Sequence, residues 1–410
     1  MHSDAAPADT ALSPIVTDYL DKVVRVATEN DFSVPESCLN TLHDELMLKG
    51  ITEACERFLP IKHLIVIGVG GSSLGLEAVH SALSDTGVTL HVLDTIAEHK
   101  VNNLLTELRD VALEDLLVCS ISKSGTTTET LTNTDVLLAK LGDQYGEIPF
   151  ERTIFVGDPE APLMLHAKEH GAAVLPMHSA IGGRYSVTTV VGCLPLALLG
   201  HNHVAFLEGV RRTVDAEHRT AIGACAEDLH TRLRDGMRVY NFFAIDLRLE
   251  DLGRWYRQLA AESLGKGFTK KGAVNPYSYL PVISTPVELH SVGQLYFSGF
   301  KEVYTEFVSF ENVPSKFHVG ESGLVPEMLT GKSMQEILTA IAAGTSGAYE
   351  ERELAFHDTQ LEHDNIEELG EYMGTRMLEV MLLARLLDVD AFNQPNVELY
   401  KDITRDVLSN

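Results

Sequence analysis

Basic residues are scarce in this chain of 410 residues, in which 32 lysines and arginines stand against 59 aspartates and glutamates. The formal net charge is −27. Binding to nucleic acid or to an anionic membrane needs a basic face, so this balance argues against both kinds of partner. Any anionic ligand must be held locally, by backbone amides, helix N-termini and a few well-placed cations.

Cysteine is scarce too, and no Cys-x-x-Cys pair occurs among Cys38, Cys55, Cys119, Cys193 and Cys225. This pattern predicts neither a disulfide framework nor a zinc ribbon, and it suits a reducing compartment. Long apolar runs are also lacking, because the longest, residues 187–199, is too short to span a bilayer. We therefore predict a cytoplasmic protein with no membrane partner.

Histidine is not scarce, with 17 in the chain, but it forms no recognisable metal motif. His201, His203 and His357 could each supply a ligand, yet no third ligand recurs beside them at helical or hairpin spacing. The sequence therefore predicts no metal and no other cofactor.

What the chain does contain is two apolar strands that each run into a turn of small residues and then a helix. The first is IVIGVGGSSLG at Ile65–Gly75, and the second is VCSISKSGTTTETL at Val118–Leu131. Such turns direct several backbone N–H groups of an α/β sheet to one anion, so we predict a ligand that carries phosphate. The alternative, two ordinary turns in which the hydroxyls cap the helices, stays open.

These turns match neither of the common nucleotide-binding motifs. Ser73 occupies the place of the third glycine of a dinucleotide fingerprint, and no Gly-Lys-Ser/Thr follows the glycines as a P-loop requires. A cradle of hydroxyls remains, which suits a single phosphate monoester: Ser72, Ser122, Ser124, Thr126, Thr127 and Thr128.

The chain as a whole alternates strand-like runs with helical patterns, which is typical of parallel sheets. A break near residues 200–203 separates two halves. From Ser333 onward the periodicity predicts mostly helices, broken at Gly344 and Gly347. Residues 351–369 mix acidic residues and histidines without a clear apolar stripe. The predicted strands are 63–68, 90–93, 116–121, 153–156 and 173–176 in the first half, and 239–245, 280–284 and 303–310 in the second.

The two turns and four further segments, in the same order along the chain, resemble the sugar isomerase (SIS) phosphate-binding domain and the glucose-6-phosphate isomerase family. The four are GGRYSVTTVVG at Gly182–Gly192, RQLAAESLGKG at Arg257–Gly267, ELHSVGQL at Glu288–Leu295 and FNQPNVELYK at Phe392–Lys401.

This resemblance implies an α/β fold of two SIS-type doubly wound αβα subdomains with parallel sheets and a helical C-terminal region. The predicted division is an N-terminal helical segment at 1–40, the phosphate-binding subdomain at 41–200, a second subdomain at 201–390, and a C-terminal helix at 391–410 that returns to the active site.

The implied reaction interconverts glucose 6-phosphate and fructose 6-phosphate, and it needs a ring opener, an acid–base residue and a group that stabilises an enediol. Glu262 matches the family's catalytic base, in a setting that its neighbours predict to be tight and apolar, and Gln258 lies one helical turn earlier. Arg184 matches the arginine that stabilises the intermediate. Without the resemblance, Glu262 and Gln258 would indicate a solvated helix face, and Arg184 a structural ion pair.

The resemblance also assigns His290 to ring opening, contributed across a subunit interface, with Lys401 assisting it. Otherwise His290 would be an ordinary core or loop histidine, and Lys401 a surface charge. We expect Gln394 and Lys401, seven residues apart, to share one face of a helix that Pro395 opens. The implied substrate-binding residues are Gly71, Ser72, Ser122, Lys123, Ser124, Thr127, Glu129, Gly183, Gln258 and Gln394.

A small sugar phosphate is thus the predicted ligand, and a homodimer with His290 donated in trans is the predicted assembly. Two other functions stay open. One is a dual-specificity phosphoglucose/phosphomannose isomerase. The other is a non-enzymatic SIS-type sensor, which would need only the two phosphate turns.

Overall fold

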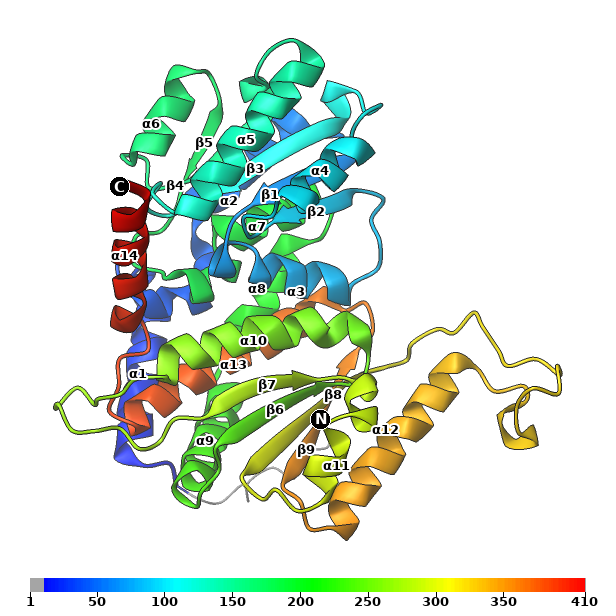
Figure 1. The fold of residues 1–410 in the computed structure, drawn as a ribbon. Coiled ribbons are helices and arrows are strands. Elements are labelled where there is room, and N and C mark those ends of the chain that lie inside the picture. Colours follow the sequence, from blue (N-terminus) through cyan, green and yellow to red (C-terminus); the bar gives the residue numbers. More distant parts are fainter. Residues whose placement is uncertain (1–10, 410) are drawn as a thin grey trace.

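The structure, a computed structural model, describes residues 11–409 and contains two parallel β-sheets, each flanked by helices (Figure 1). The fold class predicted from the sequence is therefore confirmed. The proposed boundaries at residues 40, 200 and 390 remain predictions, and residues 1–10 and 410 lie outside the described part of the chain.

The first sheet has the strand order β2-β1-β3-β4-β5, with every neighbouring pair parallel. The five predicted strands are present, with ends that differ by one residue at most. Helices α3 to α6 form the connections between successive strands. The bounds are β1 His63–Ile67, α3 Leu74–Ala82, β2 Thr89–Leu93, α4 Glu98–Glu107, β3 Leu116–Ile121, α5 Thr128–Tyr145, β4 Thr153–Gly157, α6 Pro162–Glu169 and β5 Ala173–Pro176.

The second sheet has the order β7-β6-β8-β9 and is also parallel throughout. Three of its strands were predicted. The fourth, β9, was not predicted, because it lies in the stretch 351–369 that has no clear apolar stripe, and an edge strand with one buried residue shows no apolar alternation. The bounds are β6 Val239–Ala244, β7 Leu280–Ser284, β8 Val303–Glu311 and β9 Phe356–Glu362.

Helix α12 (Met334–Glu351) runs without a break through Gly344 and Gly347, so the predicted breaks are wrong. A capping box between Ser333 and Glu336 starts the helix and satisfies two of its free backbone N–H groups. One internal glycine costs a helix only about 1 kcal/mol relative to alanine, which a well-capped helix of this length tolerates.

The remaining helices surround and join the two sheets. Figure 1 shows α10 lying between the sheets, where it contacts α3 of the first half and β7 of the second. The bounds are α1 Pro14–Glu29, α2 Glu45–Phe58, α7 Val190–Leu198, α8 His203–Arg212, α9 Ala216–Arg234, α10 Glu250–Leu264, α11 Gly293–Phe297, α13 Ile366–Leu386 and α14 Glu398–Ser409.

Apolar side chains bury both faces of each sheet, which makes each half a three-layer αβα structure. The largest cluster is shared, since it runs from α1 through both sheets to α13. A second cluster fills the space between the first sheet and α4 to α6, and a third lies between the second sheet and α12. The shared cluster fixes the two halves against each other.

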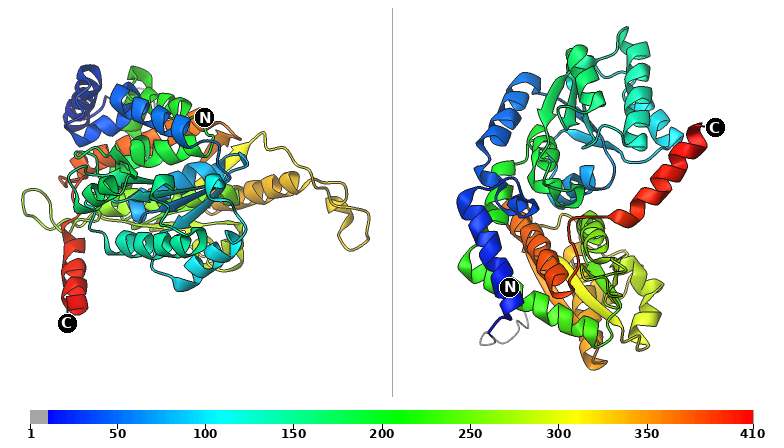
Figure 2. Two further views of the ribbon diagram at one scale, coloured as in Figure 1. Left: turned by 90° about the horizontal axis from the view of Figure 1, so that it is seen from above. Right: turned by 90° about the vertical axis from the view of Figure 1, so that its left-hand side faces the viewer.

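Two segments extend away from this core. Residues 312–332 form an arm on the side of the second sheet, and α14 projects at the other side (Figures 1 and 2). No residue of α14 is buried. Within residues 11–409, no helix is both long enough and apolar enough to cross a bilayer.

Candidate active site

The two glycine- and hydroxyl-rich turns lie side by side at one edge of the first sheet. β1 and β3 are neighbouring parallel strands, and the turns leave from their carboxyl ends. In this strand order the sheet grows in one direction from β1 and in the other from β3, and open α/β sheets bind ligands at such a switch point. The predicted phosphate site therefore occupies the ligand-binding position of the fold.

The first turn lies directly against the segment that carries Arg184 and against α10. Gly70 has a φ of 60°, and a Cβ built there would lie 2.7 Å from Gln258 Nε2. A Cβ at Gly71 would lie 2.1 Å from the carbonyl oxygen of Gly183. Only glycine permits so close an approach of the two backbones. The turn is thus joined both to Arg184 and to the helix of Glu262.

The second turn gathers hydroxyl groups at the start of α5. Ser122 Oγ donates to Thr127 Oγ1 at 3.3 Å, and Ser124 Oγ lies 2.8 Å from Thr126 Oγ1. Neither Thr127 at the start of α5 nor Ser73 at the start of α3 makes a side-chain capping bond within the described chain. Two helix N-termini therefore keep uncapped N–H groups beside each other, as an anion site requires.

Lys123 ties this second turn to the segment before Arg184. Its Nζ donates to the carbonyl of Ser179 at 2.6 Å and to that of Ile181 at 3.2 Å. Partial burial lowers the pKa of Lys123. This predicted substrate-binding residue is therefore engaged with backbone carbonyls in the free protein.

Arg184 is the buried centre of the site, with a side chain that is 2% exposed. Its N–H groups all have acceptors, which come from α10 and from the segment that precedes α14. These are Glu262 Oε2 at 2.6 Å and Gln394 Oε1 at 2.9 Å for Nη1, the carbonyls of Ala391 and Asn393 at 2.9 Å for Nη2, and Ser263 Oγ at 3.0 Å for Nε.

This saturation limits how Arg184 can meet a ligand. A substrate oxygen reaches the guanidinium only by replacing an acceptor that the protein supplies. Nη1 is the group whose two acceptors are both side chains, those of Glu262 and Gln394, which move more readily than the backbone carbonyls held by Nη2. Nη1 is therefore the edge of the cation whose protein acceptors a ligand oxygen can most readily replace.

The Glu262 carboxylate is held from both of its oxygens. Arg184 binds Oε2, and Gln258 Nε2 donates to Oε1 at 3.1 Å, as expected for residues one helical turn apart. The predicted apolar setting is wrong, because the immediate partners are a guanidinium and an amide. The amide oxygen of Gln258 is buried and accepts no hydrogen bond within the described chain.

Sequence reasoning missed two residues of this site. Ser263 is buried and bridges Arg184 Nε and the hydroxyl of Tyr185, which lies 3.0 Å away. Lys266 Nζ donates to the carbonyl of Glu262 and, at 2.8 Å, to that of Asn393. Both lie in the segment RQLAAESLGKG, and a serine and a lysine in so apolar a run were the signal to follow.

Burial, together with the nearby Arg184 cation, lowers the pKa of Lys266 from 10.5 to about 8. The lysine holds the C-terminal end of α10 to the strand of chain that supplies Gln394. It therefore positions the elements on both sides of Arg184.

Three predicted site residues form no hydrogen bond or ion pair with Arg184, Glu262 or their partners among the described residues. His290 is exposed at the end of a 3₁₀ helix (Pro286–His290), and its ring has no hydrogen-bond or ion-pair partner among the described residues. Glu129 lies in the first turn of α5. Lys401 forms an ion pair with Glu398, at 2.7 Å, on the exposed helix α14.

The predicted shared helix face of Gln394 and Lys401 is wrong. Pro395 opens a short 3₁₀ turn, and α14 begins only at Glu398, so Gln394 lies in the preceding loop. It is the loop at 391–394, and not the helix, that reaches Arg184. Among the described residues, no group of three His, Cys, Asp or Glu ligand atoms converges at this site.

Comparison with known proteins agrees with this arrangement. The chain matches the family model for phosphoglucose isomerase over residues 49–410. A glucose-6-phosphate isomerase of Thermus thermophilus is 31% identical over 358 residues, which cover 85% of this chain and 84% of the relative. A probable glucose-6-phosphate isomerase of Haloarcula marismortui is 28% identical and covers 100% of this chain and 94% of its own length.

Solved structures show the same fold. A hypothetical protein from Thermus thermophilus has a TM-score of 0.84 at 27% identity, over 97% of this chain and 95% of that one. A tagatose-6-phosphate ketose/aldose isomerase from Escherichia coli, at 13% identity and a TM-score of 0.57 over 94% of this chain and 98% of its own, shares the fold alone.

The two parallel α/β sheets and the paired glutamate and arginine beside the turn after β1 are those of a sugar-phosphate isomerase class. The chain belongs to the phosphoglucose isomerase family. The predicted enzyme activity, isomerisation between glucose 6-phosphate and fructose 6-phosphate, is confirmed at the level of this family.

Proposed function

We propose that Glu262 performs the proton transfer of this isomerisation, with the substrate phosphate held by the turns after β1 and β3. The observation that carries the proposal is the contact of the turn after β1 with the residues beside Arg184 and Glu262. The first turn touches both Gly183, next to Arg184, and Gln258, which binds Glu262. A sugar phosphate anchored at the turns therefore extends toward the carboxylate.

After ring opening, Glu262 takes the proton from the carbon beside the aldehyde carbonyl, which gives an enediol, and returns it to the former carbonyl carbon to give the ketose. A second proton moves between the two oxygens, so no redox partner is consumed. Arg184 Nη1 stabilises the negative charge that develops, once it exchanges a side-chain acceptor for a substrate oxygen.

The assembly that we propose is a two-fold homodimer in which His290 opens the ring in the partner's site. His290 is exposed and has no hydrogen-bond or ion-pair partner in residues 11–409, which supports a role outside its own chain. Nothing in the described part of the chain covers the apolar side chains of the exposed helix α14, and a second copy would supply that cover. These side chains are Leu399, Tyr400, Ile403, Val407 and Leu408, each more than half exposed.

The proposal for Glu262 is tested by Glu262→Gln. The amide keeps the shape and the hydrogen bond to Gln258 but cannot accept the substrate proton, so turnover should fall by roughly 10²–10⁴-fold. Exchange of solvent deuterium into C2 of the substrate should disappear with it. Circular dichroism and substrate binding provide the control for folding, and near-normal turnover would overturn the assignment.

Substrate range and metal dependence are tested in one coupled assay. Glucose 6-phosphate and mannose 6-phosphate are offered separately, with and without EDTA. We expect activity with glucose 6-phosphate, unchanged by EDTA. Comparable activity with mannose 6-phosphate would favour the dual-specificity isomerase, and binding without turnover would favour a sensor.

We also propose that the enzyme works in the cytoplasm. All five cysteines are free, three of them fully buried, which suits a reducing compartment.

A further inference from the structure

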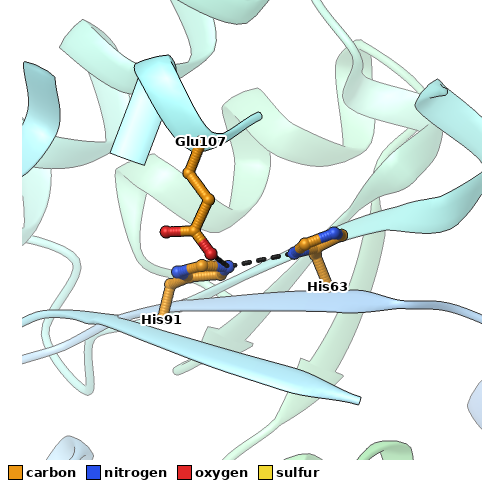
Figure 3. A group of neighbouring side chains, drawn as sticks. All are labelled: His63, His91 and Glu107. Carbon is orange, nitrogen blue, oxygen red and sulfur yellow. Dashed lines mark hydrogen bonds and ion pairs between the residues drawn. The ribbon is translucent and has the colours of Figure 1, made fainter. Parts of the chain in front are cut away.

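His63, His91 and Glu107 converge away from the active site, at the amino end of β1 (Figure 3). His63 Nδ1 lies 3.1 Å from His91 Nε2, and His91 Nε2 lies 4.0 Å from Glu107 Oε1. One possible ligand atom of each residue lies within 4.8 Å of the other two. Among the described residues, this is the one group of three with that geometry.

Backbone register brings the two rings together. β1 and β2 are parallel, with His63 opposite Thr89 and Ile65 opposite His91, so the two histidines lie diagonally on one face of the sheet. Ile65 belongs to the apolar cluster under α4, which identifies that face. α4 covers it, and Glu107 is the last residue of α4. Three elements thus contribute one ligand each.

We propose that these three side chains bind a late first-row divalent cation, for which Zn²⁺ is the probe. Two imidazoles and a carboxylate are a ligand set that Zn²⁺ accepts, with water in the fourth position. Ligand atoms about 2.0–2.2 Å from one ion lie roughly 3.3 Å apart, so the two nitrogens already have the required spacing. The Glu107 side chain, 55% exposed, is free to move the remaining distance.

The competing explanation is a simple hydrogen bond, in which one ring donates its N–H to the other. The hydrogen bond needs one of the two facing ring nitrogens to be free of a proton, whereas the metal site needs both to be free. They differ in the proton between the rings, because a cation takes the lone pairs of both nitrogens. Without a metal, Glu107 makes at most a 4.0 Å ion pair with a protonated His91, whereas in the metal site its carboxylate is the third ligand.

The position of the site indicates what a bound cation does. β2 is an edge strand of the sheet, and the cation would join it to β1 and to the end of α4. The active site lies at the opposite, carboxyl end of β1. The cation should therefore raise the thermal stability of the first half without changing turnover.

The test uses the full chain, stripped with EDTA and dialysed, and titrates it with ZnCl₂ by calorimetry in a non-coordinating buffer. We expect one equivalent that is lost in His91→Gln and at least about tenfold weaker in Glu107→Gln, because even second-shell changes weaken metal sites by 10–100-fold. Zn²⁺ should raise the unfolding temperature of wild type more than that of either variant. Glu107→Gln removes only an exposed carboxylate at a helix end, so its folding is not in question.

His80→Gln is the matched control. His80 Nδ1 and His201 Nε2 lie 2.9 Å apart in a second histidine pair, for which the described residues provide no third ligand. This variant should bind Zn²⁺ like wild type. Equal affinity and stoichiometry in all four proteins would mean that Zn²⁺ binds elsewhere and would overturn the proposal. So would a Co²⁺ titration of wild type that produced no visible d–d bands.

Discussion

At the scale of single residues, the site is organised by one buried cation whose hydrogen bonds are all taken. Arg184 holds Glu262, Gln394, Ser263 and two backbone carbonyls at once. A lysine could not replace it, because an ammonium has three donors and lacks the planar fork. The sequence identified Arg184 and Glu262 through their neighbours in the motif, but the direct bond between them was not predicted.

If the hydroxyl residues of the two turns bind the phosphate, their loss should weaken substrate binding more than it slows the chemical step. Ser122→Ala combined with Thr127→Ala should raise the KM for sugar phosphate more than it lowers kcat, since contacts to the phosphate are equal in the ground and transition states. Steady-state kinetics measures both constants. Thr106→Ala, a change of an exposed threonine on α4, serves as the control. An unchanged KM would place the phosphate elsewhere.

The lowered pKa of Lys266 predicts how the stability of the folded protein depends on pH. Its pKa is about 8 in the folded protein against 10.5 ordinarily, so the folded lysine loses its proton first as pH rises. Below pH 8 the lysine is charged in both states, and the folded state bears the cost of burying that charge. Between pH 8 and about 10.5 the cost is relieved, so the stability of wild type relative to Lys266→Met should rise.

Denaturant unfolding of both proteins at pH 7, 8, 9 and 10 measures this difference, and the other titrating groups cancel in the comparison. A difference in the free energy of unfolding that stays flat across the series would show that Lys266 is not held with a lowered pKa.

At the scale of elements, the site depends on the close backbone contact between the turn after β1 and the segment that carries Gly183. The turn after β1 meets the segment of Gly183 so closely that no side chain fits at Gly71. The same turn lies against Gln258 on α10. The turn after β1, the segment before Arg184 and α10 therefore hold fixed distances from one another.

Gly71→Ala should consequently separate these elements. Its Cβ would lie 2.1 Å from the Gly183 carbonyl, so the turn or the Arg184 segment must shift, and kcat/KM should fall by at least about 100-fold. Gly344→Ala in α12 is the control, since nothing lies within 4 Å of its added methyl group. That control should keep activity and gain about 0.5–1 kcal/mol of stability. Gly71→Ala with wild-type kcat/KM would show that the contact is not needed.

Eight of the nine strands in residues 11–409 were predictable because each is a short apolar run bounded by turn residues. β9 was not, since Phe356–Glu362 is mostly polar and pairs along one edge of β8 alone. Its place in the sheet comes from that pairing, which a local pattern does not contain. The continuity of α12 through two glycines depended likewise on its cap and its contacts.

At the scale of the whole molecule, the two halves share one topology and one active site. The order β7-β6-β8-β9 repeats the first four strands of the other sheet, although the sequence shows no repeat. Arg184 comes from the end of the first half, Glu262 from α10 between the sheets and Gln394 from the C-terminal loop. The exposed His290 and the exposed helix α14 are the two features that support the proposed homodimer.

The proposed dimer is tested by complementation. Glu262→Gln and His290→Ala homodimers should each be nearly inactive. A heterodimer should contain one site with both wild-type residues if His290 acts in trans, and so recover up to about half of the wild-type activity. The two chains are co-expressed with different tags, and the heterodimer is purified through both. A heterodimer as inactive as its parents would place both residues in the same chain's site.

The sequence by itself determined the parallel α/β class and the two glycine- and hydroxyl-rich turns, because these follow from local patterns of apolar, glycine and hydroxyl residues. The motif around Glu262 was identified through its resemblance to the family. Tertiary structure alone decided that Arg184 binds Glu262 and Gln394, that Lys266 is buried beside them, and that β9 completes the second sheet. Arg184 lies 78 positions from Glu262 and 210 positions from Gln394 in the sequence. A hydrogen bond tolerates a variation of only a few tenths of an ångström in the distance between donor and acceptor, and only the packed chain fixes that distance.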